Sequence, residues 1–393
     1  MARMSVPLWS RSAHPEEHRA EVAILGAGIA GVSAALECQR RGVSAIVIER
    51  GAIASGASSR NAGFLMRGAA DNYAAGIRDL GRERTRALWA LSEANLASLI
   101  ALGADTLPSF RRVPSCLVAM TESEAGELRT STAMLRDDGF AVDLIETHGD
   151  AVWRSPQARC GLVNPGDAVI NPVELVRHLA ARLDRPIIEH TEIAEVDRSG
   201  TEILIRCAAV QVRAPRVVVC LNAFVGRVFP EIAHWAEPNR GQMLAVRAPA
   251  DRAPVSMAYY ADHGHDYFRR VDDQTVIFGG RRHRFAPHER TETPEPTEEV
   301  QRSLEALARE TLGADYPVVA RWAGIMGFSP TGLPIVAHVP VGSGEPDARI
   351  TFCGGFTGHG MSLGFETARS AVAFALDGAP PPFPMPGPGS PGR

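Results

Sequence analysis

Three glycines and one acid near the start of the chain have the types and spacing of a phosphate-binding turn. Gly26, Gly28 and Gly31 form the sequence G-x-G-x-x-G, and Glu49 closes the next apolar run. The first glycine permits a tight turn, the second lets backbone approach a pyrophosphate, and the third lets a helix pack closely on a sheet. A carboxylate at Glu49 can accept hydrogen bonds from both ribose hydroxyls of an adenosine and would repel a 2′-phosphate. These residues predict a dinucleotide site that disfavours NADP, but they do not separate FAD from NAD.

The residues around the glycines predict the elements that position them. Residues 22–25 form a short apolar run, as in a strand buried on both faces of a parallel sheet. Apolar residues recur at helical spacing from Ile29 to Leu36, and Gly42 stands where a left-handed cap would end the helix. Such a helix directs its unpaired N–H groups and the positive end of its dipole towards the phosphates. Residues 43–48 predict the second strand of a nucleotide-binding strand–helix–strand unit.

Composition narrows the class of protein. The 393-residue chain has a formal net charge of −4, which gives no reason to expect nucleic-acid binding, and its 45% hydrophobic content is ample for a large core. All 41 basic residues are arginine, so mechanisms that need a lysine base or Schiff base are excluded. The six cysteines are scattered without C-x-x-C or metal-ligand spacing, and no metal site is expected. The N-terminal segment has no apolar signal region, and no run approaches the roughly eighteen apolar residues of a membrane span. We therefore expect a cytoplasmic protein without a transmembrane segment.

Further elements are expected along the chain. The small residues of segment 51–68 are typical of backbone that lies against a ligand. Strand patterns dominate residues 186–219, and residues 262–266, Asp-His-Gly-His-Asp, are interpreted as a hairpin turn between strands and not as a metal cluster. Helices are predicted at residues 79–102, 121–136 (opened by a capping box) and 297–312, and a strand, a glycine-rich turn and a helix at 350–376. No second G-x-G-x-x-G occurs, so a single dinucleotide is expected and its reductant would be the organic substrate.

Six separated motifs resemble, in order and spacing, the FAD-dependent D-amino-acid oxidase superfamily, in the bacterial branch with glycine oxidase, monomeric sarcosine oxidase and γ-glutamylputrescine oxidase. They are the glycine fingerprint with Glu49-Arg50, GASSRNAGF, VVVCLNA, RGQ at Arg240, WAGI at Trp322 followed by SPTGLPIV, and GGFTGHGMSLG. The resemblance implies a mixed α/β and α+β fold: a Rossmann-type FAD-binding domain with an inserted mixed-sheet substrate domain. The implied FAD-binding segments are 20–80, 160–228 and 322–378, and the substrate segments are 81–159 and 229–321. Residues 1–19 would be an N-terminal extension, and the Pro/Gly-rich residues 379–393 a disordered tail.

By motif match, the resemblance also implies which residues hold FAD. The ADP half would be held by Gly26, Gly28, Gly31, Glu49 and Arg50, with the backbone of Ile193 on the adenine side. The ribityl chain and flavin would lie along Ser58, Ser59, Arg60, Asn61, Ala62 and Gly63. The pyrimidine edge would be lined by Gly355, Gly358, His359, Gly360 and Met361, where a helix N-terminus would face the negative charge that develops on reduction. We expect FAD without a covalent link, because no cysteine stands at the sarcosine-oxidase attachment place, about Gly324, and GASSRNAGF has no histidine.

Departures from the family pattern bear on the substrate. Met326 stands where glycine and D-amino-acid oxidases carry the arginine that grips the substrate carboxylate, and Ser362 replaces a substrate-gripping lysine of sarcosine oxidase. Glycine and sarcosine are therefore disfavoured as substrates. Arg67 matches another carboxylate-binding arginine of sarcosine oxidase and is the candidate for the substrate's anionic group. Arg281, in a basic cluster, is a second candidate.

The remaining candidates for catalysis come from the same comparison. His359 would tune the charge of the reduced flavin, and Tyr259, Tyr260 and Tyr267 would lie on strands that face the flavin, with Tyr259 or Tyr267 seating the substrate. The expected reaction is oxidation of the C–N bond of an amine or amino acid, with secondary amines or N-substituted amino acids favoured, by hydride transfer to flavin N5. Oxygen or another acceptor would reoxidise the flavin. Flavin-dependent oxidation of a 2-hydroxy acid and a non-catalytic flavin-binding subunit stay open as alternatives.

Overall fold

The computed structural model describes residues 15–68, 71–342 and 344–384. Its first part is a five-stranded sheet in the order β19-β20-β13-β2-β3, in which β20, β13, β2 and β3 run parallel and β19 is antiparallel to β20. The strands are β2 (Val22–Leu25), β3 (Ala45–Ile48), β13 (Arg216–Val219), β19 (Ile335–Pro340) and β20 (Pro346–Gly354). The apolar runs of β2 and β13 are buried on both faces, as the sequence predicted.

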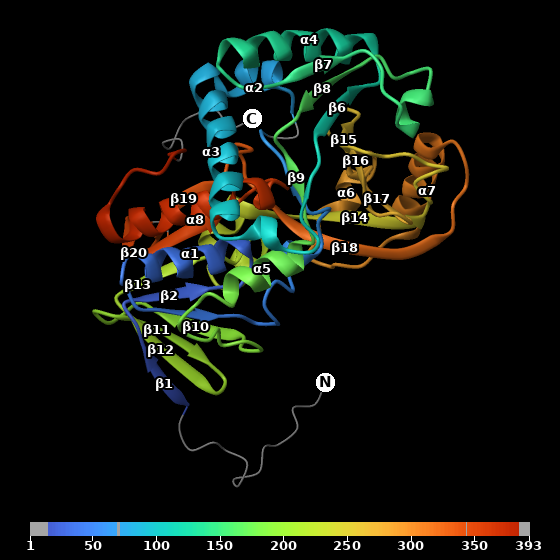
Figure 1. The fold of residues 1–393 in the computed structure, drawn as a ribbon. Coiled ribbons are helices and arrows are strands. Elements are labelled where there is room, and N and C mark those ends of the chain that lie inside the picture. The colour runs from blue at the N-terminus through green and yellow to red at the C-terminus, as the bar shows by residue number, and fades with distance from the viewer. Residues whose placement is uncertain (1–14, 69–70, 343, 385–393) are drawn as a thin grey trace.

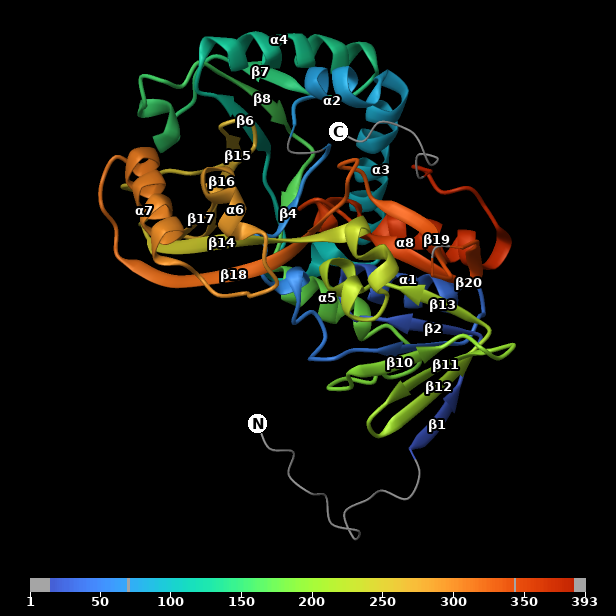
Figure 2. The same ribbon diagram turned by 180° about the vertical axis from the view of Figure 1, so that it is seen from behind.

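Different layers cover the two faces of this sheet (Figures 1 and 2). One face packs on helices, and the other on a four-stranded sheet in the order β1-β12-β11-β10. The helices are α1 (Ile29–Arg40), α3 (Arg82–Ala101), α5 (Pro172–Ala180) and α8 (Gly360–Asp377). The smaller strands are β1 (Glu16–Arg19), β10 (Ile193–Asp197), β11 (Ile203–Cys207) and β12 (Val210–Ala214). The strands β10, β11, β12 and β13 confirm the strand patterns predicted for residues 186–219.

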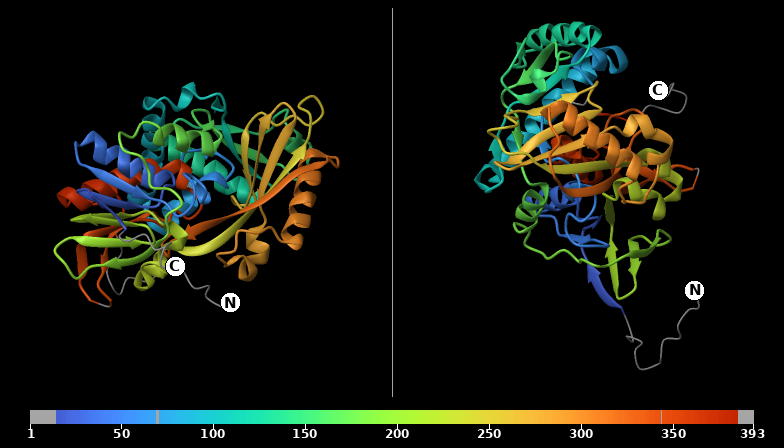
Figure 3. Two further views of the ribbon diagram at one scale, coloured as in Figure 1. Left: turned by 90° about the horizontal axis from the view of Figure 1, so that it is seen from below. Right: turned by 90° about the vertical axis from the view of Figure 1, so that its right-hand side faces the viewer.

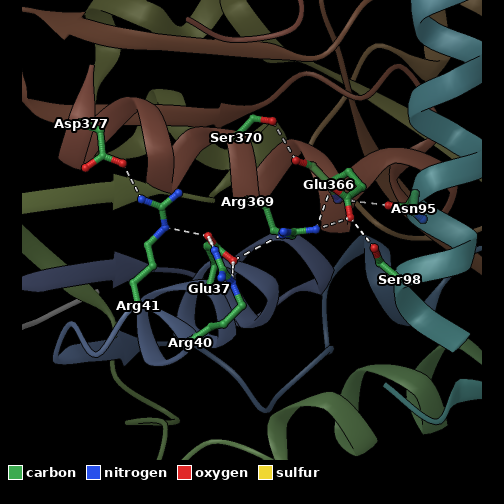
Figure 4. Close-up of polar contacts among 9 residues, drawn as sticks. All are labelled: Glu37, Arg40, Arg41, Asn95, Ser98, Glu366, Arg369, Ser370 and Asp377. Atoms are coloured by element: carbon green, nitrogen blue, oxygen red, sulfur yellow. Dashed lines mark hydrogen bonds and ion pairs between the residues drawn. The ribbon is translucent and has the colours of Figure 1, made fainter. Parts of the chain in front are cut away.

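A buried carboxylate joins α1 to α8. Glu37 is 3% exposed and accepts hydrogen bonds from Arg40 and Arg41 on its own helix and from Arg369 on α8 (Figure 4). Burial alone would raise the pKa of the Glu37 carboxyl, but the hydrogen bonds from the two α1 arginines outweigh it and lower the pKa to about 2. Buried Asn95 of α3 accepts from the Phe365 amide of α8, so three helices are held in one arrangement beside the sheet.

The second part is an eight-stranded sheet in the order β18-β14-β17-β16-β15-β6-β8-β7, antiparallel except where β15 meets β6. Figure 3 shows this sheet beside the part built on the five-stranded sheet, and the long strands β14 and β18 extend from one part towards the other. Its strands are β6 (Ser115–Ala119), β7 (Asp143–Ile145), β8 (Cys160–Asn164), β14 (Glu237–Arg247), β15 (Ala258–Ala261), β16 (Asp266–Asp272), β17 (Thr275–Gly280) and β18 (Val318–Phe328). Helices α7 (Glu298–Leu312) and α6 (Ala286–Glu289) lie near β14, and α4 (Glu122–Asp137) with α2 (Tyr73–Leu80) packs near β6 and β8. A short sheet of β4 (Phe64–Leu65), β9 (Ala168–Val169) and β5 (Arg111–Arg112) links the parts.

Local sequence signals agree with most of these elements. One half of the predicted capping box forms at α4, where the Glu124 amide donates to Thr121 Oγ1 at 3.2 Å; the Glu124 carboxylate accepts from the Met120 amide, one residue before the N-cap. The turn at residues 262–265 joins antiparallel β15 and β16, as predicted. The helix predicted at 79–102 is confirmed as α3, but it begins at Arg82, because Gly81 has φ +83° and separates it from α2.

The predicted domain boundaries stay a prediction. Strands β8 and β18 belong to the large sheet, although segments starting at 160 and 322 were assigned to the FAD-binding part. Strand β1 lies within the expected N-terminal extension, and residues 1–14 and 385–393 of the two predicted terminal segments lie outside the described residues. In the part of the chain that the structure describes, no helix has the length and apolar character to cross a membrane.

Candidate active site

A cavity of about 640 Å³ lies where the carboxyl ends of β2, β3 and β13 face the large sheet. Ligands of open α/β sheets bind outside the carboxyl ends of the strands, and this volume is in the range of ligand pockets. Seven residues predicted for the cofactor or the chemistry are not among its lining: Gly31, Ser59, Gly63, Gly355, Arg67, Tyr259 and Arg281. Every other predicted residue lines the cavity.

The glycine turn has the geometry that its spacing predicted. Gly26 has φ +99°, and a Cβ there would lie 2.8 Å from the Cys220 carbonyl oxygen. Gly31 does not line the cavity because its role is packing: a Cβ would lie 1.8 Å from the Gly26 carbonyl oxygen. A Cβ at Gly28 would lie 3.0 Å from Ser58 Oγ, which accepts a hydrogen bond from the Ile29 amide at the start of α1. The helix N-terminus and the Ser58 loop therefore meet at one side of the cavity.

Glu49 is fixed by backbone on both sides. Its Oε2 accepts from the Ala27 amide and its Oε1 from the Gly51 amide, each at 2.7 Å. A carboxylate has about four acceptor sites, so Glu49 retains capacity for hydroxyl donors. The neighbouring Arg50 guanidinium lies over the Phe224 ring at 4.9 Å.

The loop at residues 57–63 is built by its own side chains and by one buried arginine. Asn61 accepts from the Gly63 amide at 2.7 Å and donates to the Ala57 carbonyl at 3.1 Å. Gly63 has φ +70°, and a Cβ would lie 1.9 Å from the Ile170 carbonyl oxygen. Arg269 of β16, 6% exposed, donates to the carbonyls of Ala62 and Ile170. The loop thus presents a fixed backbone edge to the cavity. Gly63 does not line the cavity but packs against the Ile170 backbone.

The N-terminus of α8, which follows strand β20, also faces the cavity. Gly358 has φ +89°, and the helix begins at Gly360 after the N-cap residue His359. His359 Nδ1 lies 3.0 Å from the Thr357 carbonyl oxygen, and burial lowers the pKa of its imidazole. His359 is therefore neutral near pH 7, and the positive field at this end comes from the helix dipole.

Strand alternation divides the three tyrosines. Tyr260 and Tyr267 line the cavity with Phe64, and the three rings contact one another at centroid distances of 5.4, 5.9 and 6.2 Å. Tyr259 points to the other face of the sheet, where its hydroxyl donates to buried Asp150 at 2.7 Å. Burial raises the pKa of Tyr267 to about 12, so its phenol stays protonated near neutral pH. The seat for a substrate can therefore involve Tyr260 and Tyr267, but the structure does not bring Tyr259 to it.

The two arginines predicted for the substrate anion are paired elsewhere. Arg67 is 8% exposed, and its Nε donates to buried Asp167 at 3.0 Å while Nη1 donates to Glu93 at 2.9 Å. Arg281 contacts Asp266 and Glu310 at 3.1 and 3.2 Å. Neither lines the cavity, so neither is placed to meet a substrate there. Arg282, next in the chain and part of the same predicted basic cluster, does line it, although nothing in the sequence favours it over Arg281.

A protein-family model described as FAD dependent oxidoreductase, DAO, matches residues 21–373. The chain belongs to this DAO family of FAD-dependent oxidoreductases. The resemblance predicted from the motifs and the predicted fold class are thereby confirmed, and FAD is the cofactor.

Relatives of known name support the same family over most of the chain. The probable oxidoreductase OrdL of Rhizobium meliloti is 24% identical over 92% of this chain and 84% of that protein. The γ-glutamylputrescine oxidoreductase of Escherichia coli is 22% identical over 87% of this chain and 80% of that protein. Among solved structures, L-proline dehydrogenase from P. horikoshii has a TM-score of 0.75 at 18% identity, covering 93% of this chain and 95% of that one. That structural likeness shows the fold.

The donor set and the shape of the cavity fit a DAO-family FAD. Glycines leave backbone open at the α1 N-terminus, Glu49 stands beside it at the end of β3, and the α8 N-terminus lies at the other side of the same cavity. At Gly324, a Cβ would lie 2.6 Å from the Arg60 Cβ, so a cysteine could not stand there without movement of the loop. Met326 and Ser362, the departures from the family pattern, both line the cavity.

Proposed function

We propose that this FAD-dependent oxidoreductase oxidises the C–N bond of an amine or amino acid to an imine, which water then hydrolyses. A secondary amine or an N-substituted amino acid is favoured. The observation that carries the proposal is the wall of the cavity formed by Phe64 and by the phenols of Tyr260 and Tyr267, which burial keeps protonated. FAD, when bound, supplies the hydride acceptor at flavin N5.

The chain's residues would divide the work into holding the cofactor and placing the substrate. Backbone at Gly26 and Gly28, the α1 N-terminus and Glu49 would hold the ADP half, with residues 58–62 along the rest of the cofactor. Phe64, Tyr260 and Tyr267 form an aromatic wall against which a substrate carbon chain can pack. Positioning of the C–H bond is the main contribution expected of this wall.

No strong protein base is needed when the amine binds in its neutral form, because its nitrogen lone pair assists departure of the hydride from the adjacent carbon. The proton then released from nitrogen can pass to water. The α8 N-terminus would stabilise developing negative charge through its dipole and amide groups, and neutral His359 would donate or accept a hydrogen bond there. This division suits a chain without lysine.

The names of the relatives favour nitrogen chemistry over the alternatives. The chain spans most of a γ-glutamylputrescine oxidoreductase, and its fold is that of an L-proline dehydrogenase, whose named substrate is a secondary amine. Oxidation of a 2-hydroxy acid needs a base for the hydroxyl proton, whereas oxidation of a neutral amine does not. Oxygen or another acceptor would take the electrons. A lysine to assist oxygen cannot exist in this chain, so we expect slow reoxidation by oxygen.

An anaerobic substrate panel tests the proposal. The holoenzyme is mixed with amines, N-methyl amino acids, amino acids and the matching 2-hydroxy acids, and flavin absorbance is followed. Bleaching by a nitrogen compound but not by its hydroxy analogue is the expected result. Bleaching by 2-hydroxy acids alone would transfer the assignment to that class, and no bleaching by any compound would favour a flavin-binding subunit.

A further inference from the structure

Arg282 lines the cavity and has no acidic partner within ion-pair distance among the described residues. The described arginines that line it are Arg50, Arg60, Arg227 and Arg282. Arg50 lies 3.9 Å from Glu192, Arg227 is paired with Glu292 at 2.7 Å, and Arg60 donates to the carbonyls of Ser55 and Ala323. Within the described residues, Arg282 makes no ion pair; its one hydrogen bond is to Asn239 Oδ1 at 3.4 Å.

Unusual backbone turns Arg282 into the cavity. Gly280 and Arg281 have φ +121° and +59°, the second a left-handed conformation that a non-glycine residue rarely adopts. Asp266 holds it, because its carboxylate accepts from the Arg281 amide and contacts the Arg281 guanidinium. The result is that Arg281 is buried behind the sheet edge while Arg282 enters the cavity. Residues in such backbone are concentrated at ligand sites.

The acid nearest in effect to Arg282 is engaged by other residues. The nearby acid that acts on it, Glu289, is already bonded to Arg240 at 2.6 Å and to Gln242 at 3.1 Å. Burial lowers the pKa of the Arg282 guanidinium, yet an arginine in a protein stays protonated. A half-buried cation without an anion is costly, so a ligand anion would be favoured beside it.

The geometry also leaves the donors of Arg282 available. Its guanidinium carbon lies 4.5 Å from the centre of the Phe328 ring, and stacking on a ring face directs the N–H groups sideways. Tyr267 shares the cavity with it, and the hydroxyls of Tyr260 and Tyr267 have no protein partner among the described residues. A planar carboxylate matches the fork of an arginine, and a phenol can supply a further donor.

We infer that Arg282 binds the carboxylate of the substrate, with Tyr267 as a second donor and the Phe64, Tyr260 and Tyr267 rings against its apolar part. The inference rests on the proposed function and narrows its substrate class to amino acids or amines that carry a carboxylate. It replaces Arg67 and Arg281 as the anion-binding residue. A simple polyamine would be repelled by this cation.

The test uses anthranilate, which carries a carboxylate and an amine but no C–H on a saturated carbon beside nitrogen, so hydride transfer cannot consume it. Its neutral counterpart is 2-aminobenzamide. Dissociation constants for both are measured on the holoenzyme from the perturbed flavin spectrum and by calorimetry. The Arg282→Gln variant should bind anthranilate about ten- to a hundredfold more weakly and the amide unchanged. Arg282→Lys should recover part of the affinity.

Arg284→Gln is the matched control. It removes the same charge two positions away, from a half-exposed side chain outside the lining, and should leave both constants within about threefold. Flavin content and thermal unfolding show whether each variant is folded. Equal anthranilate affinity in Arg282→Gln and the parent, or a parent enzyme that does not prefer the carboxylate, would overturn the inference. If the preference holds but no nitrogen compound bleaches the flavin, the proposed function fails and the anion site stands.

Discussion

Ser58 Oγ accepts a hydrogen bond of 2.9 Å from the backbone amide of Ile29, the first residue of α1. Gly28, at the N-cap position, has no side chain to do this, so a loop residue from further along the chain caps the helix. The bond therefore joins the two segments predicted to hold opposite halves of FAD, the glycine turn and the loop at residues 57–63. This hydrogen bond therefore helps to fix the position of the glycine turn relative to the loop, on which binding of the whole FAD molecule depends.

Replacement of Ser58 tests the hydrogen bond between the glycine turn and the loop. Ser58→Ala should lower the free energy of unfolding of the protein by about 1 kcal/mol, the usual value of a lost helix cap, and weaken FAD binding about fivefold. Denaturant unfolding and FAD titration of the apoprotein give the two numbers. Ser370→Ala is the control, because its hydroxyl only bonds to the Glu366 carbonyl within α8 (Figure 4). Equal FAD affinity in Ser58→Ala and the parent would show that the cap does not matter to the site.

Replacement of Arg67 separates a structural from a substrate role. Asp167 is fully buried, and Arg67→Gln would leave it without its cation, which should destabilise the fold by about 3–5 kcal/mol. The anthranilate dissociation constant of the folded fraction should not change. Arg78→Gln, at an exposed ion pair, should lose less than about 1 kcal/mol. Normal stability combined with a weakened affinity for the anion would restore Arg67 as the substrate arginine.

The lowered pKa of Glu37 leads us to expect that the contact between α1 and α8 weakens in acid. Its folded pKa of about 2 lies below its ordinary value of 4.5, so between these values the unfolded chain binds more protons. The stabilisation is complete above about pH 4.5 and is lost as the pH falls towards 2. Melting temperature between pH 6 and 3 should therefore fall more steeply for the parent than for Glu37→Gln. Parallel curves for the two proteins would exclude a contribution from this carboxylate.

Acid precipitation tests how FAD is attached. Since Gly324 is packed on Arg60 and the flavin loop has no histidine, yellow colour should stay in the supernatant. Colour retained in the washed pellet would mean a covalent link from another residue.

Sequence reasoning succeeded where short-range patterns fix the structure. The turn at Gly26, the helix after it and Glu49 belong to one local unit whose spacing specifies its geometry, and the buried strand β13 followed from an apolar run. Most of the residues that the family motifs predicted for FAD also line the cavity.

It failed where distant partners or register decide the direction of a side chain. Arg67 is paired with Asp167, which lies far along the chain and carries no signal of that contact. Tyr259 and Tyr260 are neighbours in sequence, and only the register of β15 in the large sheet decides which one meets the cavity. Arg282 could not be distinguished from Arg281 within the basic cluster, because the left-handed backbone at Arg281 cannot be read from the sequence.

The central claim is cleavage of a C–H bond beside nitrogen by hydride transfer. Its direct test is anaerobic stopped-flow bleaching of the flavin by the best nitrogen substrate, unlabelled and deuterated at the carbon beside nitrogen. We predict that deuterium slows the isolated reductive step and that Arg284→Gln shows the same ratio of rates as the parent. Identical rates for the two isotopologues in that step would contradict the claim.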